Sequence, residues 1–246
     1  MALVTKTGTN DYHGSLYEYN RNTMFAANNW FNNRTGVDRP ALLINVFGAS
    51  MGGPIKKNKT FFFINYEGRR DASASIVSRV VPTDNLRNGI VMYHDSKGAL
   101  QTIGPDQIKT LVDPLHIGVD QASLKVFNMY PHGNDTGCSG ADSMNFICYR
   151  FNAPQHQKQD TYIARLDYTI DNAAKNQLFL RGNLQNDHLG GTPQFPGQPN
   201  NQDTLSNNKG LAAGWTSVLR ANIVNTVRYG FTRQGGETTG ILSCGC

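Results

Sequence analysis

The residues of this chain that could do chemistry are spaced in a way that argues against catalysis. Its six histidines form none of the HxH, HxxxH or HExxH spacings that hold a metal. His94 and Asp95 are adjacent, and neighbouring residues of a strand point to opposite faces. No GxSxG motif marks a hydrolase nucleophile, and Gly52-Gly53-Pro54 lacks the Lys-Ser/Thr of a phosphate loop. We therefore expect no enzyme, no bound metal and no cofactor.

The four cysteines favour a disulfide over a zinc site. Cys138 and Cys148 flank a polar segment and are candidates for pairing in an oxidising compartment. No CxxC motif or histidine pair accompanies them, so zinc is the weaker interpretation. Cys244 and Cys246 end the chain in a C-x-C that follows no recognisable motif.

Composition and charge favour a β protein with long polar loops. Charged residues make up 17% of the chain, below the usual ~25%, and 26 asparagines supply much of the polarity. The net charge is +5, but the densest basic cluster, Lys56, Lys57 and Lys59, falls in an expected turn, so nucleic acid is not an expected partner. No run of about 18 apolar residues predicts a transmembrane helix, and barrel strands escape that test.

Seven segments have the period-2 alternation of β-strands. They are predicted at about 4–19, 44–55, 60–68, 161–170, 178–185, 211–219 and 226–232. The clearest pattern places Tyr162, Ala164, Leu166, Tyr168 and Ile170 on one face. By itself this alternation fits a half-buried strand of a soluble sandwich equally well.

The order of the connections favours a barrel over a sandwich. Long connections at 20–40, 69–158 and 186–207 alternate with short turns, as in an up-and-down outer-membrane barrel. A helix is expected at 121–129 with Asp120 as its N-cap. The sequence thus predicts an all-β fold: a partial antiparallel up-and-down transmembrane β-barrel of about seven strands. Its long loops would be extracellular, with a short helix in the longest.

Two sets of residues are candidates for contact with a ligand. The polar strand face is expected to face the lumen of the barrel. Its candidate lumen-facing residues are Arg165, Asp167, Arg181, Asn183 and Arg228. The Asn-rich loop holds Phe25, Trp30 and Phe31, whose aromatic faces beside amide donors suit a sugar or a peptide.

Several segments resemble the Oar-like family of TonB-dependent transporters. The opening VTKTGTNDYHGSLYEYNRN (Val4–Asn22) is similar to the start of that family's barrel, and NVFGASMGGPIKKNKTFFFINYEGRR (Asn45–Arg70) to its next hairpin. Further matches follow in the family's order. They are VPTDNLRNGI (Val81–Ile90), DPLHIGVDQASLKVFNMYP (Asp113–Pro131), QDTYIARLDYTIDNAAKNQLFLR (Gln159–Arg181), FPG (Phe195–Gly197) and LAAGWTSVLRANIVNTVRYGFTR (Leu211–Arg233).

The resemblance implies an outer-membrane importer with a barrel of about 22 strands and a plugged lumen. Its implied partners are outer-membrane lipid and the TonB–ExbB–ExbD complex. We expect residues 1–234 to be part of the barrel, with 69–158 as a long extracellular loop, and residues 235–246 to be an unassigned tail of a truncated frame. A plug domain, a TonB box and a signal peptide are missing from the sequence, so the expectation is a fragment that does not transport alone.

The expected function is therefore that of a fragment of a TonB-dependent outer-membrane transporter for a bulky substrate. The alternative is a secreted β-rich module that binds carbohydrate or mediates adhesion. Dependence on detergent would distinguish the two, because a soluble monomer that unfolds cooperatively would favour the secreted module.

Overall fold

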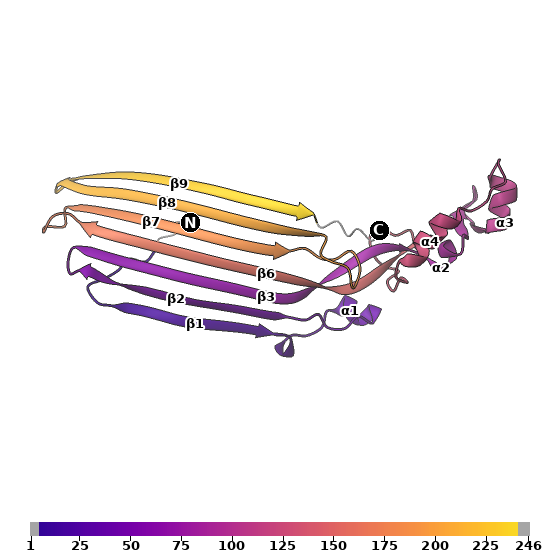
Figure 1. Ribbon diagram of the computed structural model, residues 1–246, viewed down its shortest axis with the longest axis horizontal. Coiled ribbons are helices and arrows are strands. Elements are labelled where there is room, and N and C mark those ends of the chain that lie inside the picture. Colours follow the sequence, from indigo (N-terminus) through magenta and orange to yellow (C-terminus); the bar gives the residue numbers. More distant parts are fainter. Residues whose placement is uncertain (1–4, 241–246) are drawn as a thin grey trace.

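Seven long strands form a single antiparallel sheet in the computed structural model, which describes residues 5–240 (Figure 1). The strands are β1 (His13–Asn22), β2 (Leu43–Lys56), β3 (Thr60–Pro82), β6 (Phe146–Thr169), β7 (Asn176–Gly190), β8 (Gln202–Arg220) and β9 (Ile223–Gly240). Their order in the sheet is their order in the chain. This confirms the predicted up-and-down arrangement. The sheet is not closed, and β1 and β9 are its two edges.

The connections are sorted by length to the two ends of the sheet. Short turns at 57–59, 170–175 and 221–222 lie at one end, on the left of Figure 1. The long connections at 23–42, 83–145 and 191–201 all lie at the other end. Such sorting is what an up-and-down barrel with one looped rim requires.

Several predicted boundaries are wrong because the strands are longer than the sequence pattern indicated. The loop predicted at 186–207, for example, is confined to 191–201, since β7 extends to Gly190 and β8 begins at Gln202. β3 and β6 pair in unbroken register from Thr60–Tyr168 to Pro82–Phe146, so the loop predicted at 69–158 is confined to 83–145. Small and polar residues in 69–82 gave little apolar alternation, and pairing with the partner strand stabilises this stretch instead. Pro154 is tolerated because β6 has only β3 as a neighbour there, and proline is suited to a strand edge.

The two ends of the chain also differ from the prediction. Residues 5–12 lie outside the strand expected at 4–19, since β1 begins at His13. Residues 235–240, assigned to the tail, belong to β9 and pair with β8 as far as Gly240 and Gln202. The rest of the predicted tail, 241–246, lies outside the described residues.

Short helices and a small hairpin occupy the long connections. They are η1 (Thr23–Phe25), α1 (Trp30–Thr35), α2 (Asp84–Arg87), β4 (Val91–His94), β5 (Leu100–Ile103), α3 (Pro105–Gln107), the π-helix η2 (Ile108–Val112) and α4 (Gln121–Met129). The predicted helix at 121–129 is confirmed with its cap, because the Asp120 carboxylate accepts the N–H groups of Ala122 and Ser123. The helix α1 and the β4–β5 hairpin were not predicted.

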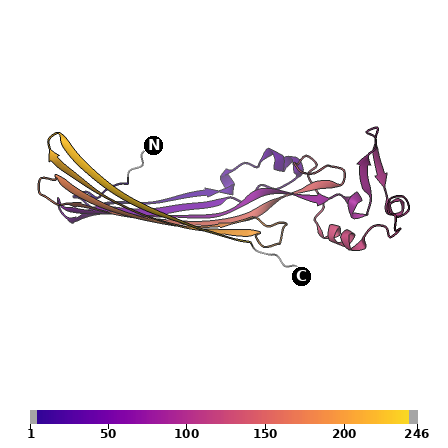
Figure 2. The ribbon, with the colours of Figure 1, turned by 90° about the horizontal axis from the view of Figure 1, so that it is seen from above.

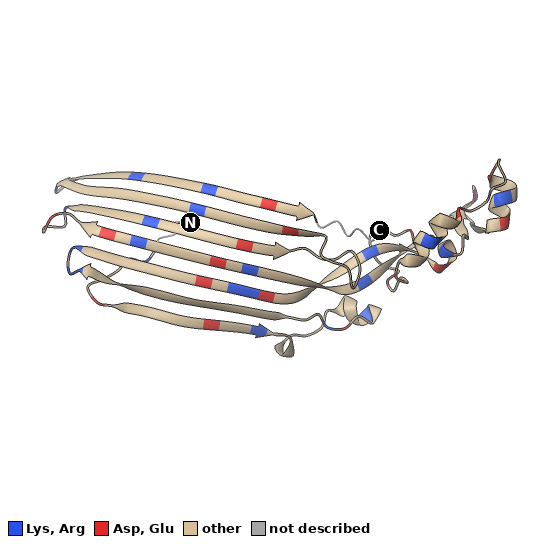
Figure 3. Cartoon of the chain, viewed as in Figure 1, with Lys and Arg blue, Asp and Glu red and all other residues tan. Residues whose placement is uncertain are grey.

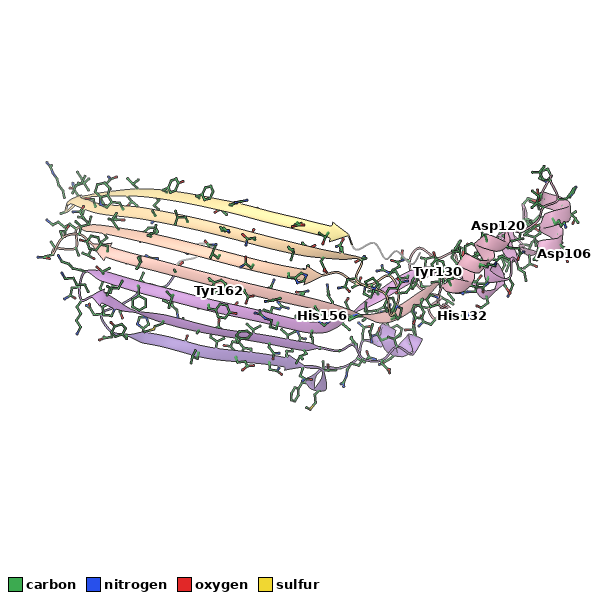
Figure 4. All side chains as sticks on the ribbon, viewed as in Figure 1. Asp106, Asp120, Tyr130, His132, His156 and Tyr162 are labelled. Carbon is green, nitrogen blue, oxygen red and sulfur yellow. A yellow bond between two sulfur atoms is a disulfide. The ribbon has the colours of Figure 1, made fainter. Side chains whose placement is uncertain are left out.

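Arg87 ties the parts of the longest connection together. Its side chain is 3% exposed. It donates to the carbonyl oxygens of Pro82 at 3.2 Å, Phe127 at 3.0 Å, Tyr130 at 2.8 Å and Pro131 at 2.5 Å. One guanidinium thus joins the end of β3, the helix α2 and the end of α4. Tyr130 is labelled in this part of the molecule in Figure 4.

The sheet has almost no interior. Seen from its edge in Figure 2, it is a single layer that no second sheet covers. The buried apolar residues among those described are Phe63, Val81, Cys148, Phe151 and Ala153. A soluble sandwich would bury its alternating apolar residues between two sheets. In this sheet such residues remain on the surface, for example Leu166 and Leu180, each 45% exposed.

Rings on one strand lie flat over glycines of the next. Tyr17 is paired with Gly48 across β1 and β2, and Phe179 with Gly214 across β7 and β8. A Cβ at either glycine would overlap the ring opposite. Glycine is therefore required at both positions, and the rings cover the sheet without standing away from it.

No helix within the described part of the chain has the length and apolarity needed to cross a membrane.

Candidate functional site

The strand register places the alternating residues on two chemically different faces. Cross-strand partners lie on the same face, so the pairs Leu166–Leu180 and Leu180–Ala213 extend one apolar surface across β6, β7 and β8. Its main members are Tyr162, Ala164, Leu166 and Tyr168 on β6, Leu178, Leu180 and Leu184 on β7, and Leu211, Ala213 and Trp215 on β8. We call this the apolar face. The residues between them form the polar face.

Aromatic residues border the apolar face at both ends. Tyr168 and Trp215 lie toward the short turns. Tyr66 and Tyr162 lie toward the long connections, with their tilted rings 4.9 Å apart between centroids. Figure 4 labels Tyr162 on the sheet. Six residues separate Tyr162 from Tyr168, about 20 Å along a strand. An apolar band of about this height between aromatic girdles is typical of sheets that cross a bilayer.

The predicted lumen residues share the polar face. Arg165 and Arg181 are directly opposite each other on β6 and β7, while Arg228 on β9 is opposite Gly214. The guanidinium of Arg165 donates to Asp167 from Nη2 at 2.8 Å and from Nε at 3.0 Å. It also lies 5.0 Å from the centre of the Phe179 ring. The fifth candidate, Asn183, pairs with Gly210 on the same face.

The residues that precede β1 cross this polar face. Arg165 Nη1 donates to the carbonyl oxygen of Thr5 at 3.2 Å. Thr5 and Lys6 cover a hollow of about 470 Å³, whose floor includes Asn65 and Arg181. Nε of Arg181 is buried and has no hydrogen-bond partner among the described residues. The polar face therefore retains, beside the hollow, a buried donor that no described residue satisfies.

Two of the three predicted loop aromatics come together. The Trp30 and Phe31 rings meet edge to face at 5.1 Å, and the Arg34 guanidinium lies 5.6 Å and 5.7 Å from their centres. Arg150 approaches Phe31 from β6 at 5.9 Å. Trp30 remains 66% exposed, so a face of this cluster is free to meet a ligand. Phe25, 87% exposed on η1, is not part of the cluster.

A buried carboxylate holds the two arginines beneath these rings. Asp135 is 3% exposed and lies 3.2 Å from Arg34 Nη2 and 3.8 Å from Arg150 Nη1. Arg150 Nε also donates to Asn32 Oδ1 at 3.1 Å. Sequence reasoning missed Arg34, Asp135 and Arg150, because Arg34 is more than a hundred residues from the other two in the chain.

A disulfide joins Cys138 to Cys148 beside this cluster. Reducing it is expected to destabilise the segment it closes by about 2 kcal/mol, because the open segment gains conformational entropy when unfolded. Limited proteolysis of the chain carrying Cys244→Ser and Cys246→Ser should then cleave 138–148 roughly 30-fold faster after reduction. The variant Cys138→Ala, Cys148→Ala should be insensitive to the reductant. Equal cleavage before and after reduction would contradict the prediction.

Carboxylates in the long connections stabilise the loop conformation by accepting hydrogen bonds from backbone N–H groups. Asp142 accepts from Phe146 and Asn145 at 2.8 Å and from Met144 at 3.0 Å. These hydrogen bonds, that of Phe146 first, lower the pKa of Asp142 below its ordinary value. A lowered folded-state pKa contributes stability that is present above the unfolded pKa of about 4 and is lost as the pH falls through the folded value.

Acid should accordingly open the segment 142–146. We expect its local opening, measured by hydrogen exchange corrected for intrinsic rates, to rise as the pH falls below about 4. The variant Asp142→Asn should lack this pH dependence, because its side chain does not titrate. A variant with an unchanged pH profile would show that another group is responsible.

The histidines are distributed over loops and strands. His132 Nδ1 is 2.7 Å from Asp84 Oδ1, and His188 Nε2 is 3.6 Å from Asp203 Oδ2. Among residues 5–240, no three His, Cys, Asp or Glu side chains are grouped as metal ligands would be.

Comparison with known proteins gives one match. The model of the family described as "Outer membrane beta barrel domain" matches residues 4–242. No curated protein matches the chain. No solved structure matches it either.

Proposed function

Because the chain belongs to the outer membrane β-barrel domain family, we propose that its sheet is part of the wall of a TonB-dependent importer for a bulky substrate. Membership of the family implies a location in the bacterial outer membrane. A secreted module, the alternative drawn from the sequence, does not fit that location.

The observation that carries the proposal is the division of one sheet into an apolar and a polar face. The hydrocarbon core of a bilayer cannot hydrogen-bond, so the face with Leu166, Leu180 and Ala213 suits acyl chains. The opposite face carries Arg165, Arg181 and Arg228, which suits a water-filled interior. The long connections at one rim of the sheet also support the proposal of an importer's wall.

Transport requires that the two open edges be paired. The unpaired N–H and C=O groups of β1 and β9 would face hydrocarbon, where each costs several kcal/mol. We infer that further strands complete the cylinder in the membrane. The family resemblance suggests about 22 strands in all, which encloses a lumen wide enough for a plug.

In the importer a substrate would meet the loop cluster first and the polar face afterwards. Trp30 and Phe31 present aromatic surface at the outer rim, with Asn28 and Asn33 in the same loop. Further along the path, Arg181 lines the hollow beneath Thr5 and Lys6. Rings beside amides bind sugars and peptides, so a glycan or peptide is the expected class of substrate.

Comparative analysis of spent medium tests the import function. Cultures that lack the gene should leave a bulky solute that the parent strain consumes, and cultures that lack TonB should leave the same solute. Complementation with the unaltered gene should restore uptake, and complementation with Trp30→Ala, Phe31→Ala should restore it only weakly. A solute profile that loss of the gene leaves unchanged, or that loss of TonB does not reproduce, would refute the proposal.

A further inference from the structure

The apolar face ends, on β8 and β9, in two cations that lie side by side. Lys209 is directly opposite Arg233 in the register, and both side chains are exposed. Figure 3 shows blue positions on β8 and β9 next to each other. We propose that these two residues bind the phosphate group of a membrane lipid whose acyl chains lie on the apolar face below them.

No carboxylate of residues 5–240 neutralises the pair. Like charges directly opposite each other destabilise a sheet. Neither Lys209 nor Arg233 lies within ion-pair distance of a carboxylate anywhere in the described part of the chain. Their neighbours along the face are the pair Asn207–Gly235 on the loop side and the pair Leu211–Phe231 on the turn side. An anion bound between the two cations would remove the repulsion.

Other basic residues on the same face already have a partner. Arg70 Nη2 lies 2.7 Å from Asp160 Oδ1, and Lys158 Nζ lies 3.9 Å from Asp160 Oδ2. The acidic residue nearest to Arg233 along β9 is Glu237, four residues away or about 13 Å along the strand. Lys209 and Arg233 are thus distinguished from Arg70 and Lys158 by the lack of a carboxylate.

An apolar hollow begins directly below the two cations. It has a volume of about 1170 Å³, and Lys209 is part of its rim. Its walls include Tyr66, Tyr162, Leu184, Leu211 and Phe231 of the apolar face. The tyrosines mark the loop-side aromatic border, so the cations are at the height where a bilayer's headgroups begin.

The position of two adjacent cations directly above an apolar hollow favours a lipid over a soluble anion. Cα atoms of directly opposite residues lie about 5 Å apart, so two long cationic side chains can reach the oxygens of one phosphate. A soluble anion would use the two charges and leave the hollow unused. A phosphorylated lipid uses both, because its chains cover the apolar surface while its headgroup neutralises the pair.

Lipid binding to the full chain in a neutral detergent tests the proposal. The probes are dioleoyl phosphatidic acid, dioleoyl phosphatidylcholine and inorganic phosphate, and binding is measured by native mass spectrometry and by competition. We expect phosphatidic acid to bind more tightly than phosphatidylcholine, and inorganic phosphate at millimolar concentration not to displace it. The double variant Lys209→Gln, Arg233→Gln should lose the preference for phosphatidic acid over phosphatidylcholine. Its affinity for phosphatidic acid should fall roughly 30-fold, as expected for the loss of two interfacial cations.

Matched variants distinguish specific binding at Lys209 and Arg233 from a general attraction of anionic lipid to positive charge. Lys158→Gln removes a cation from the same face and should leave the preference unchanged. Lys209→Arg with Arg233→Lys keeps both charges and should retain it. Equal binding of the two lipids, a preference that survives in the double glutamine variant, or an equal loss in Lys158→Gln would overturn the proposal. Displacement by inorganic phosphate would assign the site to soluble anions and overturn the choice of a lipid.

Discussion

Replacing Arg87 with alanine is expected to lower the free energy of local opening of the longest connection by about 4 kcal/mol. The change removes the donor of four hydrogen bonds to the carbonyls of Pro82, Phe127, Tyr130 and Pro131. Hydrogen bonds to a charged group contribute about 1.5–3 kcal/mol each, and water entering the vacated space recovers part of the total. The expected effect is an increase in hydrogen exchange of about a thousandfold across 83–90 and 121–131.

Two variants show whether the branched shape of the Arg87 side chain matters. Arg87→Lys keeps the charge but offers a single ammonium group, which cannot reach carbonyls on three segments. It should lose most of the same stability. Arg39→Ala, which removes an exposed arginine that donates to the carbonyl of Ala26 at 2.8 Å, should cost about 1 kcal/mol or less. An Arg87→Ala variant with exchange close to that of Arg39→Ala would contradict the role assigned to Arg87.

Placing an arginine at Ala213 is expected to destabilise the sheet in a bilayer by about 3 kcal/mol. Ala213 is in the middle of the apolar face, opposite Leu180 on β7 and Tyr229 on β9. A cation at the midplane of a membrane sheet costs about 2–4 kcal/mol because it loses its hydration. The quantity to measure is the free energy of unfolding of the full chain from phosphatidylcholine vesicles in urea.

The same substitution on the opposite face is the control. Thr216 is on β8 as well, but on the polar face, opposite Gln177 and Thr226. Thr216→Arg should change the free energy of unfolding by less than about 1 kcal/mol, because the new charge stays in water. If the two variants lose equal stability, the assignment of the two faces is wrong.

The alternation of apolar and polar residues predicted the strands well where one face of the sheet is apolar. The run from Tyr162 to Thr169 at the end of β6 alternates apart from Ile163, and this stretch was recognised as a strand from sequence alone. The order of the strands followed from the connection lengths, because adjacent antiparallel strands are the simplest solution for short turns. The helix at 121–129 was recognisable because its cap, Asp120, is local.

The sequence did not reveal features that depend on pairing between distant segments. Residues 69–82 and 146–158 were predicted to be loop, and the structure pairs each with the other as the outer parts of β3 and β6. In the same way, the cluster beneath Phe31 needs Asp135 and Arg150 from segments that had been predicted to be loop. Local patterns carry no information on such contacts.

The glycines beneath Tyr17 and Phe179 have a consequence for the width of the proposed passage. Both rings are on the polar face and lie flat against the neighbouring strand. Bulky side chains therefore line the inner wall without narrowing the bore. An alanine at Gly214 would push the Phe179 ring inward and away from Arg165. The clearance for a large solute is thus set by positions that have no side chain at all.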